Sequence, residues 1–202
     1  TVAFIFARGN SRGIPKKNLL ALGDKPLIAW SIEKALKVKR IDQIIVSTDS
    51  VEIAQVAASY GAEVPYLRPA DLATDESPEW FSWRHALQNY KDATGHFPKC
   101  FVSIPTTSPL REAEDIDKCL DIYFKCDCDA VVTVTESRRN PYFNLCHKDA
   151  EGQIKLFSPL QNAITRRQDA PKTYDLTTVC YVVNPQFIMR ANSLFQGKVI
   201  EI

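Results

Sequence analysis

The sequence predicts an α/β fold in which helices cover both faces of a mainly parallel sheet. Two observations support this fold class. Short apolar runs of strand length alternate with amphipathic runs of helix length over the first two thirds of the chain, and polar residues directly follow the strand-like runs. The length of 202 residues suits one domain. We therefore expect a single domain over residues 1–202, interrupted by an irregular excursion at 138–172.

Strand signals open this pattern. The first run, residues 2–7, is continuously apolar, which is typical of a strand buried on both faces of a parallel sheet. Pro65 interrupts the run at 63–67 and places that strand near an edge, because proline has no N–H to donate. A weaker strand pattern occurs near 154–157. Strands are expected at 2–7, 41–47, 63–67, 100–104, 130–135 and 178–183.

Helix signals fall between these strands. Pro26 opens an apolar stripe at helical spacing, and Ser50 is a suitable N-cap for a helix that stops at Gly61. Aromatic residues at helical spacing between 79 and 91 are expected to pack in the core. Helices are expected from Pro26 onward and at 51–60, 79–91 and 112–125.

The composition disfavours several classes of protein. Hydrophobic residues make up 45% of the chain and support a packed core, and a net charge of +1 gives no overall attraction to nucleic acid or anionic membranes. No apolar run approaches the ~20 residues of a transmembrane helix, and no basic region precedes residues 2–7 as a secretory signal would require. The six cysteines lack the paired spacing of a zinc site, so we expect reduced thiols in a cytoplasmic protein.

A local excess of positive charge lies in the polar loop at 8–18, which follows the first strand. This loop holds four cations together with Gly9 and Gly13. Glycines let the backbone N–H groups approach a ligand, and arginine forks bind phosphate oxygens in pairs, so the loop indicates a polyphosphate site. Its spacing matches neither a P-loop nor G-x-G-x-x-G. A solvated basic turn is the alternative, and RNA binding is disfavoured because no aromatic residues interleave with the basic ones.

The same loop resembles the N-terminal signature of the acylneuraminate cytidylyltransferases, the CMP-sialic acid synthetase family. The resemblance runs from residue 2 to about residue 183. It is carried by FARGNSRGIPKKN at 6–18, IVSTD at 45–49, LRPA at 67–70, TSPLR at 107–111 and RRQD at 166–169.

This resemblance implies a three-layer Rossmann-like nucleotidyltransferase fold and transfer of a cytidylyl group from CTP to an acidic nine-carbon sugar of the N-acylneuraminate type. Pyrophosphate would be released, with Mg²⁺ or another divalent cation as cofactor. CTP and the acidic sugar are the expected partners, with no nucleic acid and no membrane. A homodimer is also implied, in which the excursion at 138–172 forms a dimer contact.

The resemblance also implies a role for individual residues of this sequence. The residues expected to be catalytic, by holding the triphosphate, are Arg8, Arg12 and Lys17. The residues expected to bind the nucleotide are Ala7, Gly9, Asn10, Ser11, Asn18, Arg68, Ser77 and Thr107. The residues expected to bind the sugar are Arg166, Arg167, Gln168 and Tyr181. The Asp-x-Asp metal motif of the family would follow the last core strand, so the metal ligands are expected beyond Ile202.

Three positions depart from the family pattern. Pro105 stands where Gln is common, Thr177-Thr178 where Asn-Gly is expected, and Glu79 where Ser is common. Because these departures concern the acceptor sugar, the cytidylyl half of the reaction is the better supported half. The same chemistry on a pseudaminic- or legionaminic-type sugar is one alternative, and a non-catalytic relative that binds a nucleotide or sugar is the other.

Overall fold

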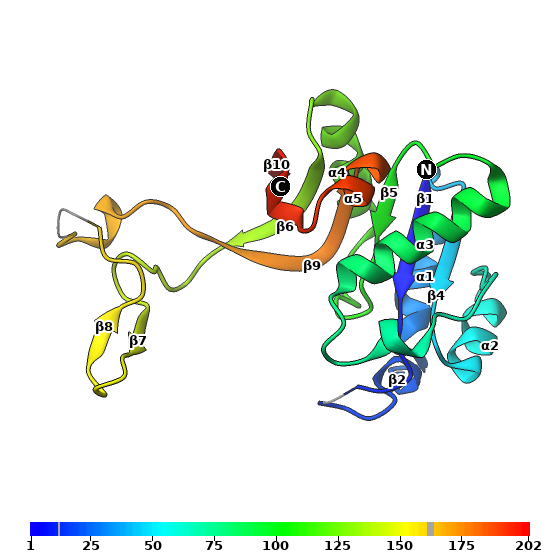
Figure 1. The fold of residues 1–202 in the computed structure, drawn as a ribbon, viewed down its shortest axis with the longest axis horizontal. Coiled ribbons are helices and arrows are strands. Elements are labelled where there is room, and N and C mark those ends of the chain that lie inside the picture. The colour runs from blue at the N-terminus through cyan, green and yellow to red at the C-terminus, as the bar shows by residue number, and fades with distance from the viewer. Residues whose placement is uncertain (12, 161–163) are drawn as a thin grey trace. The chain divides into compact units, whose positions relative to one another are not determined.

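The computed structural model describes residues 1–11, 13–160 and 164–202 (Figure 1). Arg12, one of the expected catalytic residues, therefore lies outside the described residues. The chain divides into two compact units, which we call unit 1 (Thr1–Thr133 with Thr178–Ile202) and unit 2 (Val134–Thr177). Within the described ranges, we find no helix with the length and apolar character needed to cross a membrane.

A six-stranded sheet in the order β10-β6-β9-β5-β1-β4 forms the centre of the fold. β1 pairs in parallel with β4 and β5, β10 pairs in parallel with β6, and β9 runs antiparallel to β5. The predicted mainly parallel sheet is thus confirmed. Its strands are β1 (Val2–Phe6), β4 (Gln43–Ser47), β5 (Phe101–Ser103), β6 (Ala130–Glu136), β9 (Tyr174–Val183) and β10 (Val199–Glu201).

Two layers of helices cover the sheet, as the three-layer prediction requires. Side chains of β1 point alternately to the two sides: Ile5 packs with α1, α2 and α4, whereas Phe4 packs with α3 and α5. Figure 1 shows α3 crossing one face of β1 and β4. The helices are α1 (Leu27–Leu36), α2 (Val51–Ser59), α3 (Glu79–Thr94), α4 (Ala113–Lys125) and α5 (Pro185–Arg190).

Local sequence signals explain where these helices begin and end. Ser50 Oγ accepts a hydrogen bond from the Ile53 N–H at 3.3 Å and caps α2. After α2, Gly61 adopts a left-handed φ of 91°, which suits a residue without a side chain. α4 starts with a capping box in which the Glu112 side chain and the Asp115 side chain each bind the other's backbone N–H.

The strand predicted at 63–67 is wrong. The segment makes only two isolated parallel bridges, Ile45 to Glu63 and Thr48 to Leu67. Pro65 lies between them and cannot donate to a neighbouring strand, so no continuous ladder forms. The helix expected from Pro26 starts one residue later, because Pro26 instead belongs to a small hairpin of β2 (Ala21–Leu22) and β3 (Lys25–Pro26).

Unit 2 contains little regular structure. Its hairpin pairs β7 (Cys146–Lys148) with β8 (Ile154–Leu156), which includes most of the weak strand predicted at 154–157. Short 3₁₀ helices occur in both units, at η1 (Lys17–Leu19), η2 (Ala70–Ala73), η3 (Arg167–Asp169) and η4 (Leu194–Gln196).

Candidate functional site

A cavity of about 530 Å³ lies in unit 1, lined by the loops that follow β1 and β5, by the segment between α2 and α3, by the start of α3 and by the unit 1 part of β9. Since parallel strands place their carboxyl ends at one edge of a sheet, the loops after β1 and β5 meet there. The lining residues are Phe6, Arg8, Ser11, Gly13, Ile14, Lys17, Asn18, Arg68, Leu72, Thr74, Ser77, Glu79, Ser82, Pro105, Thr106, Thr107, Thr178 and Tyr181.

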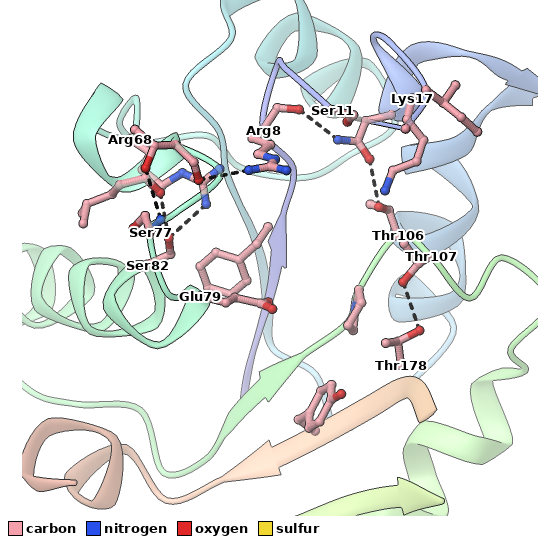
Figure 2. Close-up of a pocket in the computed structure, with 18 residues that line it drawn as sticks. Arg8, Ser11, Lys17, Arg68, Ser77, Glu79, Ser82, Thr106, Thr107 and Thr178 are labelled. Carbon is pink, nitrogen blue, oxygen red and sulfur yellow. Dashed lines mark hydrogen bonds between the residues drawn. The ribbon is translucent and has the colours of Figure 1, made fainter. Parts of the chain in front are cut away.

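Asn18 ties two of these loops together. Its side-chain Nδ2 donates to the Arg8 carbonyl at 3.1 Å, and its Oδ1 accepts from Thr106 Oγ1 at 2.8 Å (Figure 2). The Asn18 side chain is buried, with 4% of its surface exposed, so these bonds are shielded from water. At the start of the loop, the Gly9 N–H donates to Asp49 Oδ1 at 2.8 Å. The loop after β1 is therefore fixed at both ends against neighbouring segments.

Two cations of this loop reach the cavity. Arg8 forms an ion pair with Asp75, Nη2 to Oδ1 at 2.6 Å, and its Nη1 donates to the Thr74 carbonyl at 3.0 Å. One third of the Arg8 side chain is exposed to solvent. Lys17 also lines the cavity, and in Figure 2 its ammonium group points into open space. By contrast, Lys16 does not line the cavity and pairs with Glu52 at 2.8 Å on the surface.

Arg68 provides a third cation from the opposite wall. Only 6% of its surface is exposed. Its Nη1 donates to Ser82 Oγ at 3.2 Å, while its Nε has no hydrogen-bond partner among the described residues. Burial lowers the pKa of this guanidinium, although the nearby Asp49 and Glu79 charges oppose that shift. A buried donor without a partner is costly, which makes Arg68 a strong candidate for a ligand contact.

Glu79 begins α3 and faces the same cavity. Its Oε1 accepts a hydrogen bond from Trp83 Nε1 at 3.2 Å. Glu79 is an exposed residue, but its carboxyl group lies against neighbouring protein, and the resulting desolvation raises the pKa of that group. Burial also raises the pKa of Tyr181, and the Glu79 charge adds to that shift.

Hydroxyl groups occupy the remaining edge of the cavity. Thr107 Oγ1 donates to Thr178 Oγ1 at 3.0 Å, and Ser108 Oγ lies 2.9 Å from the same atom. These three hydroxyls are exposed or half-buried and offer both donors and acceptors to a polyhydroxylated ligand.

Buried Arg111 holds this edge in place. Its Nε donates to the Val179 carbonyl at 2.8 Å, and its Nη1 donates to Ser31 Oγ at 2.7 Å. Its Nη2 donates to the carbonyls of Thr178, at 3.1 Å, and Pro105. Burial lowers the pKa of Arg111 to about 10. With all its donors directed into the protein, Arg111 supports the cavity wall and does not line it.

Most residues expected from the sequence meet in this one cavity. Those that line it are Arg8, Ser11, Lys17, Asn18, Arg68, Ser77, Thr107 and Tyr181. Ala7 is fully buried at the end of β1, and Gly9 and Asn10 belong to the loop without lining the cavity.

The expected sugar-binding residues of the RRQD stretch belong to unit 2. There Arg166 Nε pairs with Asp169 at 2.7 Å, and Arg167 and Gln168 line a separate hollow of about 400 Å³ within unit 2. Tyr181 alone, among the residues expected to bind the sugar, lines the unit 1 cavity.

Sequence reasoning missed several lining residues. Ser82 received no role, although it lies one turn after Glu79 on α3 and accepts from Arg68. Thr106, which the sequence places beside Thr107 at the ligand-facing end of a strand, was given no binding role but also lines the cavity. Among the described residues, no group of three His, Cys, Asp or Glu side chains is placed to hold a metal ion.

Comparisons with known proteins show the family to which this chain belongs. Residues 2–199 match the family model described as cytidylyltransferase. The chain is 36% identical over 194 residues to a CMP-N,N'-diacetyllegionaminic acid synthase of Campylobacter jejuni, covering 95% of this chain and 80% of that protein. It is 39% identical over 141 residues to an N-acylneuraminate cytidylyltransferase of Escherichia coli, covering 68% of this chain and 32% of that protein.

Among solved structures, a CMP:2-keto-3-deoxy-manno-octonic acid synthetase in complex with CTP has a similar fold. The TM-score is 0.70 at 16% sequence identity, and the match covers 100% of this chain and 89% of that one. This likeness supports the predicted fold class.

Proposed function

This chain belongs to the cytidylyltransferase family, and from that premise we propose that it transfers a cytidylyl group from CTP to an acidic nine-carbon sugar and releases pyrophosphate. The expectation of a CTP-dependent nucleotidyltransferase is confirmed by the family. The observation that carries the proposal is the convergence of Arg8, Lys17 and Arg68 on one cavity. Three cations from separate segments match a substrate that carries several negative charges.

Arg8 and Lys17 form the phosphate side of the proposed site. A hydroxyl oxygen of the sugar forms a bond to the α-phosphorus of CTP while the bond between that phosphorus and the α–β bridging oxygen breaks. The electron pair leaves with pyrophosphate, and the hydroxyl proton passes to solvent. In this type of reaction the protein contributes positioning and charge stabilisation, so Arg8 and Lys17 would hold the leaving group and balance its growing charge. Ser11 and Asn18 would keep the loop in position.

The acceptor sugar is proposed from the relatives and from the hydroxyl-lined edge. The two relatives are named for a legionaminic acid and an N-acylneuraminate, so we propose an acceptor of this nonulosonic class, with pseudaminic-type sugars included in the test. Thr107 and Tyr181 would contact the sugar or the reacting phosphate from this edge. Pro105 offers no side-chain hydrogen bond at its position.

A divalent cation, with Mg²⁺ as first choice, is proposed as a component that enters with the triphosphate. Mg²⁺ commonly binds through substrate phosphates together with one or two protein carboxylates. We assign no step of the reaction to the metal. The six free cysteines support a cytoplasmic location.

Unit 2 is proposed as a homodimer contact. Ile154 and Phe157 are 69% and 62% exposed, which is unfavourable for large apolar side chains unless another surface covers them. We also propose that the sugar is bound by residues of this unit, namely Arg166, Arg167 and Gln168. Light scattering should give the mass of a dimer, and Phe157→Asp should shift it toward the monomer. A monomeric wild-type protein at micromolar concentration contradicts this role.

Pyrophosphate release tests the proposed reaction. The protein is mixed with CTP, Mg²⁺ and, in turn, N-acetylneuraminate, a legionaminic acid and a pseudaminic acid, and each mixture is repeated with ATP, GTP and UTP. We expect release that requires both CTP and one of the sugars. Release that ignores the base refutes the cytidylyl assignment, and nucleotide binding without release with any sugar supports the non-catalytic alternative.

A further inference from the structure

Glu79 is the one acidic side chain among the described residues that line the cavity. The same lining holds Arg8, Lys17 and Arg68, which suit the anionic groups of the substrates. A carboxylate would repel a triphosphate and a sugar carboxylate alike. Glu79 must therefore face a neutral part of a substrate, one that donates hydrogen bonds.

The Glu79 carboxyl is held so that it can accept such a bond. Trp83, only 4% exposed, donates its Nε1–H to Oε1 at 3.2 Å and restricts the side chain. Figure 2 shows the carboxyl group directed toward the interior of the cavity. A carboxylate oxygen is an acceptor only, so this position favours an N–H or O–H donor.

Arg68 supplies the complementary half of a recognition pair. Its guanidinium and the Glu79 carboxylate act on one another's charge, and its Nε has no partner among the described residues. The ring of Phe6 lines the same cavity and offers an apolar surface for a flat base. A donor and an acceptor beside an aromatic ring form a surface suited to the edge of a nucleobase.

We propose that Glu79 accepts a hydrogen bond from the 4-amino group of cytosine and thereby selects CTP over UTP. Cytosine places this amino donor beside the acceptors N3 and O2, which match a carboxylate next to a guanidinium. Uracil has an acceptor, O4, in place of the amino group, and Glu79 repels it. Glu79 is thus a specificity determinant for the base, although it stands at a position where the sequence departs from its relatives.

This inference rests on the proposed function, and its test separates the two. Glu79→Gln keeps the shape of the side chain but adds an N–H₂ that can donate to uracil O4. The ratio of kcat/KM for CTP to that for UTP, measured with the same sugar, should fall about tenfold or more, since a paired base contact is worth at least one factor of ten. Glu79→Ser, which removes the charge and shortens the side chain, should lower the same ratio.

Glu76→Gln is the matched control, because Glu76 is exposed in the preceding loop and does not line the cavity. The ratio of kcat/KM for CTP to that for UTP in Glu76→Gln should equal that of the wild type. Thermal unfolding of every variant shows whether the fold is retained.

Calorimetric binding of CTP and of UTP without sugar gives a readout that needs no turnover. Tighter binding of CTP in the wild type, and loss of that preference in both Glu79 variants, supports the inference even if no sugar is turned over, in which case only the proposed reaction fails. An unchanged CTP-to-UTP ratio together with a raised KM for the sugar overturns the inference and places Glu79 on the acceptor side.

Discussion

Arg8 and Arg68 line the same cavity but differ in solvent exposure and in the partners of their guanidinium groups. Arg8 is one-third exposed and already bound to a carboxylate, Asp75, at 2.6 Å. Arg68 is 6% exposed, donates to a neutral hydroxyl, and makes no ion pair with a described residue. One cation is neutralised and solvated, and the other is desolvated with an unused donor.

The two arginines therefore differ in what each must give up, and what each gains, when a ligand binds. An ion pair near the surface contributes little to stability, so Arg8 can exchange Asp75 for a phosphate at small cost. A buried guanidinium that makes no direct ion pair is costly to fold, even with the Asp49 and Glu79 charges nearby, so a ligand that pairs with Arg68 would recover part of that cost. Arg8 should therefore act on a group whose charge changes during the reaction, and Arg68 on a group that stays the same.

The largest expected effect is that of Arg8→Ala on turnover. Removing a preorganised charge from the leaving-group side should lower kcat/KM by about 100-fold or more, mainly through kcat. Lys16→Ala is the control, because Lys16 belongs to the same loop but pairs with Glu52 outside the cavity. Steady-state pyrophosphate release gives both values. Equal losses in the two variants would mean that only the overall charge of the loop matters. The sequence predicts a loss similar to that of Arg8→Ala for Arg12→Ala.

Arg68→Met should affect binding more than chemistry. Loss of charge-assisted bonds to a bound nucleotide raises KM for CTP about ten- to thirtyfold, with kcat within about threefold of the wild type. Because the substitution removes a buried charge that makes no direct ion pair, the thermal unfolding midpoint should not fall. A lowered midpoint combined with unchanged KM would show that Arg68 is structural.

A smaller effect concerns pH. Desolvation by the surrounding protein raises the pKa of the Glu79 carboxyl, so it gains a proton at a higher pH than a glutamate in a free peptide does. The titratable groups that face it are Arg68 and Tyr181. Arginine keeps its proton in proteins, and burial and the Glu79 charge move the Tyr181 pKa upward, so neither group changes its protonation state between pH 5 and pH 8. The preference for CTP over UTP should therefore fall several-fold as the pH drops from neutral. The triphosphate titrates alike in both nucleotides and cancels, and Glu79→Gln should give a flat profile.

The smallest effect should come from Asp75→Asn. The substitution weakens the partner that competes with phosphate for Arg8, while the bond from Arg8 to the Thr74 carbonyl remains available. CTP should bind about two- to fivefold more tightly, in line with the modest value of a solvent-exposed ion pair. Calorimetry measures this change. Weaker binding would show that Asp75 positions Arg8 for the ligand and does not compete with it.

The fold was largely predictable because its central strands are buried on both faces. The continuous apolar runs of β1 and β4 and the capped start of α2 at Ser50 carry that signal in the sequence. The failure at 63–67 has a local cause, since apolar residues there resemble a strand but Pro65 prevents continuous pairing. Pairing depends on partners that lie far away in the chain, which is also why the antiparallel direction of β9 was not foreseen.

The candidate residues of the loop after β1 were all visible in one stretch of sequence, whereas the opposite wall was predicted only in part, through Arg68 and Ser77. Arg8, Lys17 and Asn18 fall in one short stretch, so their clustering is visible without a structure. Ser82 contributes a single hydroxyl from a distant segment and had no signal in the sequence, whereas Thr178 was noticed only as a departure from the family pattern. Glu79 was noticed as a departure that bears on the sugar, but its proximity to Arg68 became apparent only once α3 was placed.

Arg111 limits how the cavity wall can be redesigned to bind a different substrate. Its guanidinium joins the Pro105 carbonyl, Ser31 on α1, and the carbonyls of Thr178 and Val179 on β9. Because Arg111 bonds to all of these segments, they can be exchanged for those of another protein only together. A graft of residues 105–111 from a relative should be accompanied by the matching stretch of β9 and by a hydroxyl at position 31, because any other junction leaves donors of a buried cation without partners.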